Sequence, residues 1–375
     1  MRGSVYRRGR SWRAVIDLPR GESGKRCQRS ATFATRRAAE DWLVRTAASI
    51  GALSHADAQR MSLRVYLDQW QEAIGPSLKP NTAHNVARAK ARLLAELDGG
   101  MPLGRITPAV VQAAVHRLGT THAAGTARRD LMWLRSAMKQ AVAWGYLAQN
   151  PTSGVRPPRG AEPEMRCWNE VEAKAFLAAV EGRTRYALFF RLALATGMRA
   201  GEILGLRWRD VDWERGALRV VHSLSWPGKE PPQLLDPKTK GSRRVVWVDA
   251  STLATLRRHR DLQLRERDQC AGEWSDLDLV IATGQGGYVR LRDLWRVLST
   301  AARRAGVPRI RIHDLRHTHG TLLLRQGRGV KEVADRLGHA NPSMLLQRYA
   351  HVLPDQQADV ARTIGQVLDG SGDLS

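Results

Sequence analysis

A proline-rich stretch at residues 149–166, QNPTSGVRPPRGAEPEMR, divides the chain into parts that cannot share one continuous element. Proline fixes φ and has no backbone N–H to donate, so neither a helix nor a central strand continues through its four prolines. The 375 residues also exceed what one ordinary core accommodates. We therefore expect two or three domains, with a linker around residues 151–165.

Two different patterns precede this linker. Residues 1–55 combine short, partly alternating segments with a helical segment that follows Thr35, which predicts a small β-sheet and one helix. Residues 61–155 carry apolar side chains at helical spacing in four segments, and Ser62 and Thr107 are expected to cap two of these helices. A helical domain is therefore expected at 61–155.

Residues 163–375 are the largest part and mix helical with strand-like segments. The apolar stretch RYALFFRLALAT predicts a buried helix, whereas GALRVVHSL and SRRVVWVD predict short strands. The fold class expected for the whole chain is mainly α with small antiparallel sheets, an α+β arrangement.

The charge balance favours nucleic acid as the partner. Sixty Lys and Arg residues against thirty-six Asp and Glu residues give a formal net charge of +24 at pH 7, and such a field attracts polyanions. A GC-rich genome is another explanation for abundant arginine, but it does not explain the shortage of acidic residues.

Nothing in the sequence indicates a membrane or secreted protein. No run approaches the roughly 18 apolar residues of a membrane helix, and no apolar segment follows the basic N-terminus as in a secretory signal. Cys27, Cys167 and Cys270 are far apart and odd in number, which disfavours a disulfide framework and a CxxC metal site. We expect a cytoplasmic protein with no membrane contact.

The segment ATGMRAGEILGLRWRDVDW contains the first candidate site residue. Gly197 marks a break after an apolar helix, and Arg199 follows at the start of the next helix, where the dipole favours an anion. Glu202 lies three residues further on and can hold the guanidinium in place. An ordinary ion pair at a helix start explains this segment equally well.

The segment LDPKTKGSRRVVWVD predicts a hairpin with two lysines in its turn. Lys238 and Lys240 precede the second strand. A lysine on such a turn can reach a site as a mobile acid, although most turn lysines are simply solvated.

The segment IHDLRHTHG places three histidines around an arginine. His313, Arg316 and His317 share one face of a helix, whereas His319 is directed elsewhere. His313 and His317 have the spacing of a metal pair, and His339 could be a third ligand. However, there is no HExxH motif or nearby cysteine, and arginine repels a cation. An anion is the better ligand, because guanidinium groups match phosphate oxygens.

The segment VADRLGHANPSMLLQRYAHV contains the remaining candidates. Gly338 is expected to end a helix, and His339 is then held just beyond it. Asn341 and Pro342 suit the start of the next helix, with Tyr349 about two turns along. A phenol surrounded by positive charge is an activated nucleophile.

Together these segments resemble the active site of the tyrosine recombinases, the phage-integrase family. TGMRAGEILGLRW, HDLRHTHGTLLL and LGHANPSMLLQRYAHV match the family's motifs over about residues 166–355. Residues 61–155 resemble the helical, SAM-like core-binding domain, and residues 1–55 more weakly resemble an arm-type DNA-binding module. The resemblance implies a three-domain architecture and is strongest to heterobivalent integrases of actinobacterial prophages and integrative elements.

The resemblance implies a site-specific recombinase that cuts and rejoins DNA through a 3′-phosphotyrosine and so integrates or excises a mobile element. Two alternatives stay open, a type IB topoisomerase-like strand transferase and a non-catalytic DNA-binding regulator. The catalytic residues that it implies are Arg199, Lys238, His313, Arg316, His339 and Tyr349.

By the same resemblance, Tyr349 attacks the scissile phosphate and Lys238 protonates the leaving 5′-oxygen. Because the turn offers two lysines, Lys240 is the alternative acid and otherwise a DNA contact. Arg199 and Arg316 stabilise the charge on the non-bridging oxygens.

His313 is implied to assist proton transfer at the tyrosine, and His339 to hydrogen-bond a non-bridging oxygen. His317 and His319 are expected to pack or hydrogen-bond beside the site. Neither a cofactor nor a metal is expected, since the phosphotyrosine conserves the energy of the broken bond.

Double-stranded DNA is the implied partner, as core sites and separate arm sites. A homotetramer on DNA, a host bending factor and an excision factor are further implied partners. The arm-site contacts are expected from the basic residues Arg7, Arg8, Arg10 and Arg13.

Overall fold

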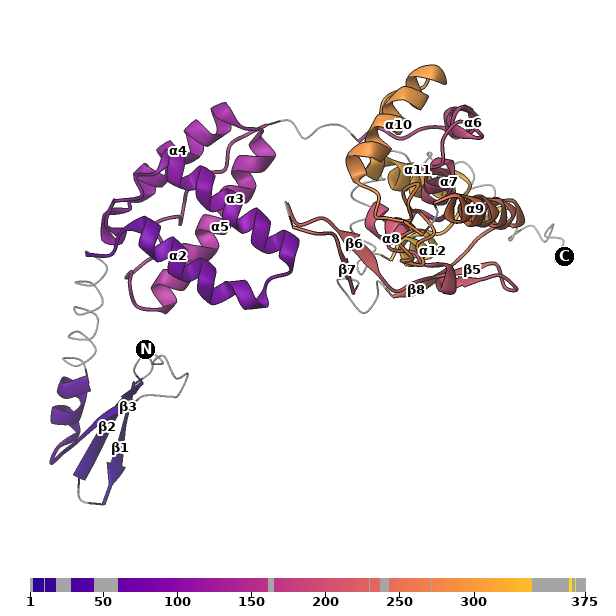
Figure 1. The fold of residues 1–375 in the computed structure, drawn as a ribbon. Helices are drawn as coiled ribbons and strands as arrows, with labels where there is room; N and C mark the ends of the chain where they lie inside the picture. Colours follow the sequence, from indigo (N-terminus) through magenta and orange to yellow (C-terminus); the bar gives the residue numbers. More distant parts are fainter. Residues whose placement is uncertain are drawn as a thin grey trace. The chain divides into compact units, whose positions relative to one another are not determined.

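The computed structural model divides into two compact units, Met1–Pro163 and Glu164–Ser375 (Figure 1). The residues that it describes are 3–9, 11–17, 28–43, 60–160, 165–228, 230–236, 243–270, 272–338, 364, 365 and 368. Helices dominate and the strands form small antiparallel sheets, which confirms the expected α+β class. No helix in these ranges is long and apolar enough to cross a bilayer.

A three-stranded antiparallel sheet opens the first unit. Its strands, in the order β1-β2-β3, are β1 (Gly3–Arg8), β2 (Ser11–Asp17) and β3 (Gln28–Phe33). Residues 36–43 form a helix, and the Thr35 hydroxyl accepts a hydrogen bond from the Ala38 N–H at 3.2 Å. The rings of Phe33 and Trp42 lie 5.8 Å apart, so the helix packs on the sheet. The sheet and helix expected here are confirmed.

A bundle of four helices follows in the first unit. The helices are α2 (Leu63–Ile74), α3 (Pro80–Glu96), α4 (Pro108–Thr121) and α5 (Ala124–Ala143). The Ser62 and Thr107 hydroxyls cap α2 and α4, each accepting a backbone N–H at 3.3 Å. Trp70, Leu93 and Leu134 belong to the shared core. Because apolar residues recur at helical spacing, these four helices were predictable from the sequence.

The proline-rich stretch packs against this bundle over residues 151–160, so the expectation of a linker is wrong for this part. The Gln112 side chain donates to the Arg156 carbonyl at 3.2 Å and accepts its N–H at 2.8 Å. Val155 is buried. Side-chain hydrogen bonds thus replace the helical ones that proline prevents, and the boundary between the units falls at residues 163 and 164.

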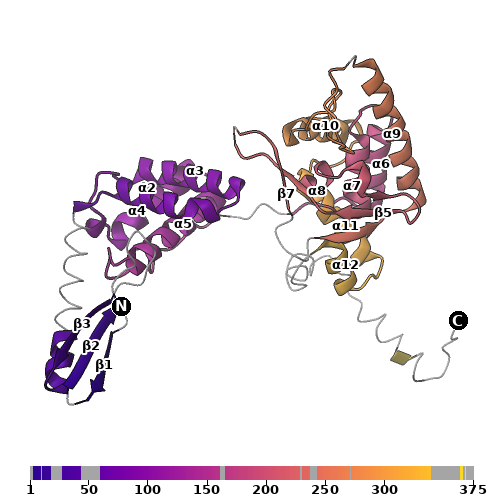
Figure 2. The ribbon, with the colours of Figure 1, turned by 60° about the horizontal axis from the view of Figure 1, so that its bottom comes forward.

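The second unit has a central helix pair, α7 and α11, which lie side by side (Figures 1 and 2). Phe189, Phe190 and Leu315 are buried in its core. The helices of this unit are α6 (Glu170–Val180), α7 (Ala187–Thr196), α8 (Ala200–Leu204), α9 (Ala250–Gln269), α10 (Leu291–Arg304), α11 (Ile312–Arg325) and α12 (Val330–Leu337). Its strands are β4 (Val211–Asp212), β5 (Ala217–Val220), β6 (Ser223–Ser225), β7 (Gln233–Leu235) and β8 (Arg244–Trp247).

The observed strand pairing in the second unit differs from the predicted lysine hairpin. β6 pairs with β7, whereas β8 pairs with β5, all antiparallel. The chain therefore runs out along β5 and β6 and returns along β7 and β8, with its reversal between Ser225 and Gln233. Lys238 and Lys240 fall between β7 and β8 in the sequence. Both lie outside the described residues.

Candidate active site

The corner between α7 and α8 places Arg199. Gly197 ends α7 with a left-handed φ of 64°, and a Cβ there would lie 2.5 Å from Leu337 Cδ2 and 2.6 Å from His319 Cδ2. Arg199 caps α8, and its N–H donates to Glu202 Oε2 at 2.9 Å while its Nη1 donates to Oε1 at 2.8 Å. Glu202 therefore holds this guanidinium, as the spacing predicts.

Glu202 is buried, with 3% of its surface exposed, and it also binds Arg244 of β8. Arg244 Nη2 donates to Oε2 at 2.9 Å, and Nη1 donates to Oε1 at 3.3 Å. Burial by itself raises the pKa of Glu202, but the hydrogen bonds and charges of Arg244 and Arg199 lower it below its ordinary value. The carboxylate is therefore ionised at neutral pH and shared by two guanidinium groups.

The sequence prediction did not single out Arg244. A usable signal is the two-residue period of a strand, because Arg244 and Val246 lie on the same face of β8 and Val246 is buried. An arginine on the inward face of a strand requires a buried acceptor. Glu202 supplies it.

Arg316 enters the interior from α11 and is 3% exposed. Its Nη1 donates to the Gly197 carbonyl at 2.8 Å and its Nη2 to the Leu337 carbonyl at 2.7 Å. These carbonyls lie at the C-terminal ends of α7 and α12, where helix carbonyls lack intrahelical partners and the dipole is negative. Two helix ends therefore fix the position of this guanidinium.

Three arginine side chains donate hydrogen bonds to the C-terminal end of α12. Gly338 ends the helix with a left-handed φ of 68°, as predicted. The carbonyls of residues 336, 337 and 338 each accept a hydrogen bond from a different guanidinium. The donors, in that order, are Arg244 Nε at 3.1 Å, Arg316 Nη2 at 2.7 Å and Arg199 Nη2 at 3.5 Å. Arg199 and Arg316 thus bind the carbonyls of the two residues that precede His339.

His313 and His317 lie next to one another on α11, as expected from their spacing. Their rings are 4.8 Å apart and perpendicular. His313 is exposed and His317 is buried. Because only His313 of this pair is exposed, it is the histidine that a bound anion can reach from solvent.

His319 is directed away from this pair, as predicted. Its Nδ1 donates to the Leu194 carbonyl at 2.8 Å, and its Nε2 accepts from Arg336 Nε at 3.2 Å. Burial, with the charges of Arg336 and Arg316, lowers the pKa of His319 to about 4, although the bond to Leu194 opposes the shift. His319 is therefore a neutral, buried contact behind the site.

Three of the remaining predicted residues lie in the N-terminal sheet. Arg7 and Arg8 lie in β1 and Arg13 in β2, and Arg13 Nη2 donates to Ser30 Oγ at 3.0 Å. All three belong to the first unit. The predicted residues outside the described ranges are Arg10, Lys238, Lys240, His339, Asn341, Pro342 and Tyr349.

The charge of the cluster suits an anion. Three arginine guanidiniums, those of Arg199, Arg244 and Arg316, are linked through Glu202 and the end of α12. Among the described residues, no three His, Cys, Asp or Glu side chains group as a metal site. Guanidinium groups that outnumber the carboxylate can stabilise the oxygens of a phosphate.

Comparison with known proteins places this cluster in context. The model of the family described as "Phage integrase family" matches residues 168–356. A "Tyrosine recombinase XerC-like" protein from Caldanaerobacter subterraneus subsp. tengcongensis is 28% identical over 95% of this chain and 96% of its own length.

Two solved structures share the fold. The Tn1549 transposon integrase in complex with transposon right end DNA matches with a TM-score of 0.68 at 19% identity, over 82% of this chain and all of that chain. A lambda integrase dimer bound to a COC′ core site matches with a TM-score of 0.56 at 17% identity, over 92% of this chain and 93% of that one.

Proposed function

Because the chain belongs to the phage integrase family, the tyrosine recombinases that cut and rejoin DNA, we propose that it integrates and excises a mobile DNA element at specific sites. The observation that carries this proposal is the convergence of Arg199 and Arg316 on the carbonyls of Gly338 and Leu337. The two guanidiniums contact adjacent carbonyls directly before His339 in the chain, and we propose that they bind one phosphate.

The first chemical step is the attack of the Tyr349 phenol oxygen on the scissile phosphorus. The new bond joins phosphorus to the tyrosine oxygen, and the bond between phosphorus and the 5′-oxygen breaks. The phenol proton passes to His313, and Lys238 donates a proton to the leaving 5′-oxygen. The products are a 3′-phosphotyrosine and a free 5′-hydroxyl.

The second step reverses the first with a different strand. The 5′-hydroxyl of a partner duplex attacks the phosphotyrosine, so the phosphodiester is restored and Tyr349 is released. One phosphoester replaces another in each step, so the bond energy is conserved. Arg199, Arg316 and His339 stabilise the charge that builds on the non-bridging oxygens.

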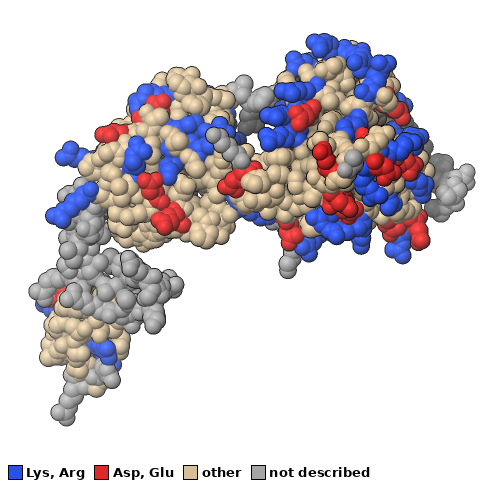
Figure 3. All heavy atoms as spheres, viewed as in Figure 1, with Lys and Arg blue, Asp and Glu red and all other residues tan. Residues whose placement is uncertain are grey.

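The surface charge supports DNA as the substrate. Figure 3 shows Lys and Arg gathered over the part of the second unit formed by α10, where exposed arginines lie at positions 292, 296, 303 and 304. Such a surface binds the phosphate backbone without reading its sequence. The arginines of the N-terminal sheet and Lys240 add further contacts, at arm sites and at the core site respectively.

The assembly that we propose is a tetramer on two core sites, because exchange joins strands of two duplexes and each cut requires one tyrosine. Arm sites bound by residues 1–55 and the core site bound by residues 61–155 and 163–375 position these protomers. A host bending factor and an excision factor set the direction of the reaction.

A covalent trapping experiment tests the proposal. The probe is a nicked duplex of the core sequence, which is the repeat at the two junctions of the element that encodes the chain. Because the nick releases the fragment that carries the 5′-hydroxyl, the cleaved intermediate accumulates. We expect Tyr349→Phe to abolish the adduct while core-site affinity changes less than about threefold, since phosphate contacts dominate binding.

Tyr288→Phe is the matched control, because Tyr288 also lies in the second unit but outside the arginine cluster. We expect this variant to form the adduct at the wild-type rate. An adduct in Tyr349→Phe, or a DNA-linked peptide that maps to Tyr288, would refute the assignment. Exchange between two labelled duplexes then separates recombination from simple relaxation of one duplex.

A further inference from the structure

The carboxylate of Glu202 lies between two guanidiniums with very different exposure. The Arg244 side chain is 9% exposed and that of Arg199 is 40% exposed. Each carboxylate oxygen accepts one hydrogen bond from Arg244 and one from Arg199, at distances of 2.8 to 3.3 Å. These four bonds fill the acceptor sites of the carboxylate.

A buried carboxylate needs a buried cation, and Arg244 is the better placed of the two. Burial raises the pKa of Glu202, and the hydrogen bond and charge of Arg244 oppose this more strongly than the bonds from Arg199 do. One positive charge therefore offsets one negative charge within the interior. The charge of the more exposed Arg199 is then available to an anion.

We infer that Arg244 is a positioning residue, which offsets the charge of Glu202 so that Arg199 can turn its own charge to the scissile phosphate. The inference rests on the proposed function. Without Arg244, the buried carboxylate would draw the Arg199 guanidinium toward itself and away from the substrate. Arg244 thus acts on the reaction through two other residues.

A second contact of Arg244 supports this role. Its Nε donates to the Arg336 carbonyl at 3.1 Å, next to the carbonyls that bind Arg316 and Arg199. The end of α12 is in close contact with this side chain, since a Cβ on Gly338 would lie 3.1 Å from Arg244 Nη1. Arg244 therefore also ties β8 to the helix end that spaces the two guanidiniums.

The test measures the rate of adduct formation by the full-length protein at saturating concentrations of the nicked core-site duplex. We expect Arg244→Gln to slow this rate by about tenfold to a hundredfold, the size of effect that a small misplacement of a catalytic group produces. Adding Glu202→Gln to this variant should recover part of the loss, because a neutral amide no longer attracts Arg199. Arg244→Lys keeps the charge and should lose less than Arg244→Gln.

Arg243→Gln is the matched control, since Arg243 precedes Arg244 but is 61% exposed and pairs with the exposed Asp236. Its rate should stay within about twofold of wild type, as for other surface ion pairs. Core-site binding and thermal melting show whether each variant is folded. If Arg244→Gln does not fold, a folded Arg244→Lys variant that cleaves as slowly as Arg199→Ala overturns the inference.

Two further outcomes separate this inference from the proposed function. A wild-type rate in Arg244→Gln, or a double variant slower than the single one, overturns the positioning role and leaves the recombinase intact. Absence of any adduct from the wild-type protein overturns the recombinase and the positioning role together.

Discussion

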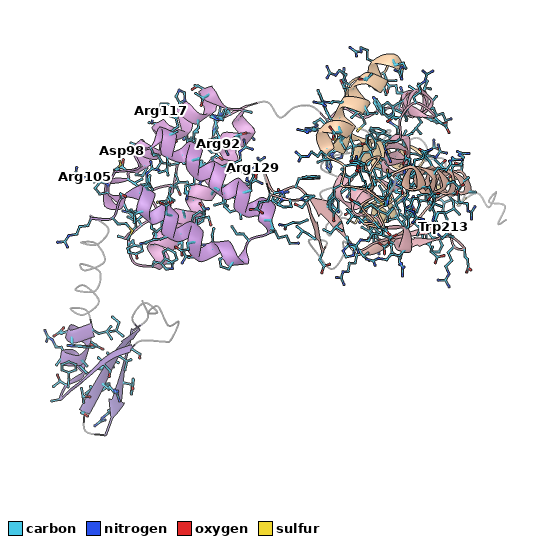
Figure 4. All side chains as sticks on the ribbon, viewed as in Figure 1. Arg92, Asp98, Arg105, Arg117, Arg129 and Trp213 are labelled. Carbon is cyan, nitrogen blue, oxygen red and sulfur yellow. The ribbon has the colours of Figure 1, made fainter. Side chains whose placement is uncertain are left out.

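Two arginines of this protein, Arg92 in the first unit and Arg316 in the second, have different kinds of hydrogen-bond acceptor. In the helical bundle, Arg92 of α3 (labelled in Figure 4) donates to both oxygens of Asp130 at 2.6 and 2.7 Å. In the second unit, Arg316 donates to two helix-end carbonyls at 2.8 and 2.7 Å. A carboxylate cancels a guanidinium charge, whereas a carbonyl orients the group and leaves the charge in place.

This difference separates a structural arginine from one that can serve a reaction. Asp130 is fully buried, so the pair that it forms with Arg92 contributes to the fold and offers no net charge. Around the end of α12, by contrast, the guanidiniums of Arg199 and Arg244 share the one carboxylate of Glu202. Helix-end carbonyls and the negative ends of the helix dipoles stabilise the positive charge there.

The largest expected effect on the rate of adduct formation comes from replacing Arg316, and the matching substitution in the helical bundle replaces Arg92. Arg316→Ala should slow adduct formation by about a hundredfold to a thousandfold, as expected when a main donor to the transition-state oxygens is lost. Arg92→Ala should leave the rate at saturating DNA near that of wild type but lower the free energy of unfolding by about 3–5 kcal/mol, because Asp130 stays buried without its partner.

Adduct rates at saturating DNA and urea unfolding curves for the two variants check this prediction. If Arg92→Ala were slow and Arg316→Ala only unstable, the distinction between the two settings would be wrong.

The same contrast shows what could be predicted from the sequence. The four-helix bundle was predictable because each helix buries an apolar stripe that repeats along its own sequence, as with Leu63, Tyr66 and Trp70. Arg199 and Glu202 were also predictable as a pair, since three residues along one chain fix their separation.

Contacts between distant segments were not predictable in this way. Arg244 reaches Glu202 across 42 positions and the Arg336 carbonyl across 92, and no local spacing encodes either contact. The predicted strand pairing was wrong for the same reason, because β8 pairs with β5 and not with β7, which is nearer in the sequence. The packing of residues 151–160 on the bundle likewise depends on Gln112, far back in the chain.

A second prediction concerns the effect of acid on the two units. His319 and His259 of the second unit are buried, and burial lowers the pKa of each to about 4, whereas no histidine is buried in the described part of the helical bundle. The unfolded chain takes up a proton near pH 6.5 that the folded form takes up only near pH 4. The folded state therefore loses stability as pH falls through this window, by about 3 kcal/mol per histidine.

Urea unfolding of the full chain at pH 7.5 and pH 5 should show about 2 kcal/mol of this loss per histidine, because the folded form is still mostly unprotonated at pH 5. The loss should be restricted to the transition of the second unit. His319→Asn keeps a donor for the Leu194 carbonyl and should remove about half of the acid-induced loss of stability. The remaining half comes from His259, which is unchanged in this variant. Equal acid sensitivity of His319→Asn and wild type would show that His319 is not the group responsible.

The smallest expected effect compares two left-handed glycines of the second unit, one inside the site and one outside it. Gly197 has a φ of 64°, and a Cβ there would overlap Leu337 and His319, whereas Gly182 has a φ of 66° and nothing within 4 Å. Both alanine variants carry the backbone cost of about 1–2 kcal/mol, but only Gly197→Ala adds an overlap of about 1–3 kcal/mol. Because Leu337 carries the carbonyl that binds Arg316, Gly197→Ala should also slow adduct formation, and Gly182→Ala should not.

Thermal melting and adduct rates, measured for both variants, check this prediction. Equal losses of stability would mean that the end of α12 moves to accommodate a new methyl group. In that case a flexible contact, and not a rigid helix end, would hold the guanidinium groups in place.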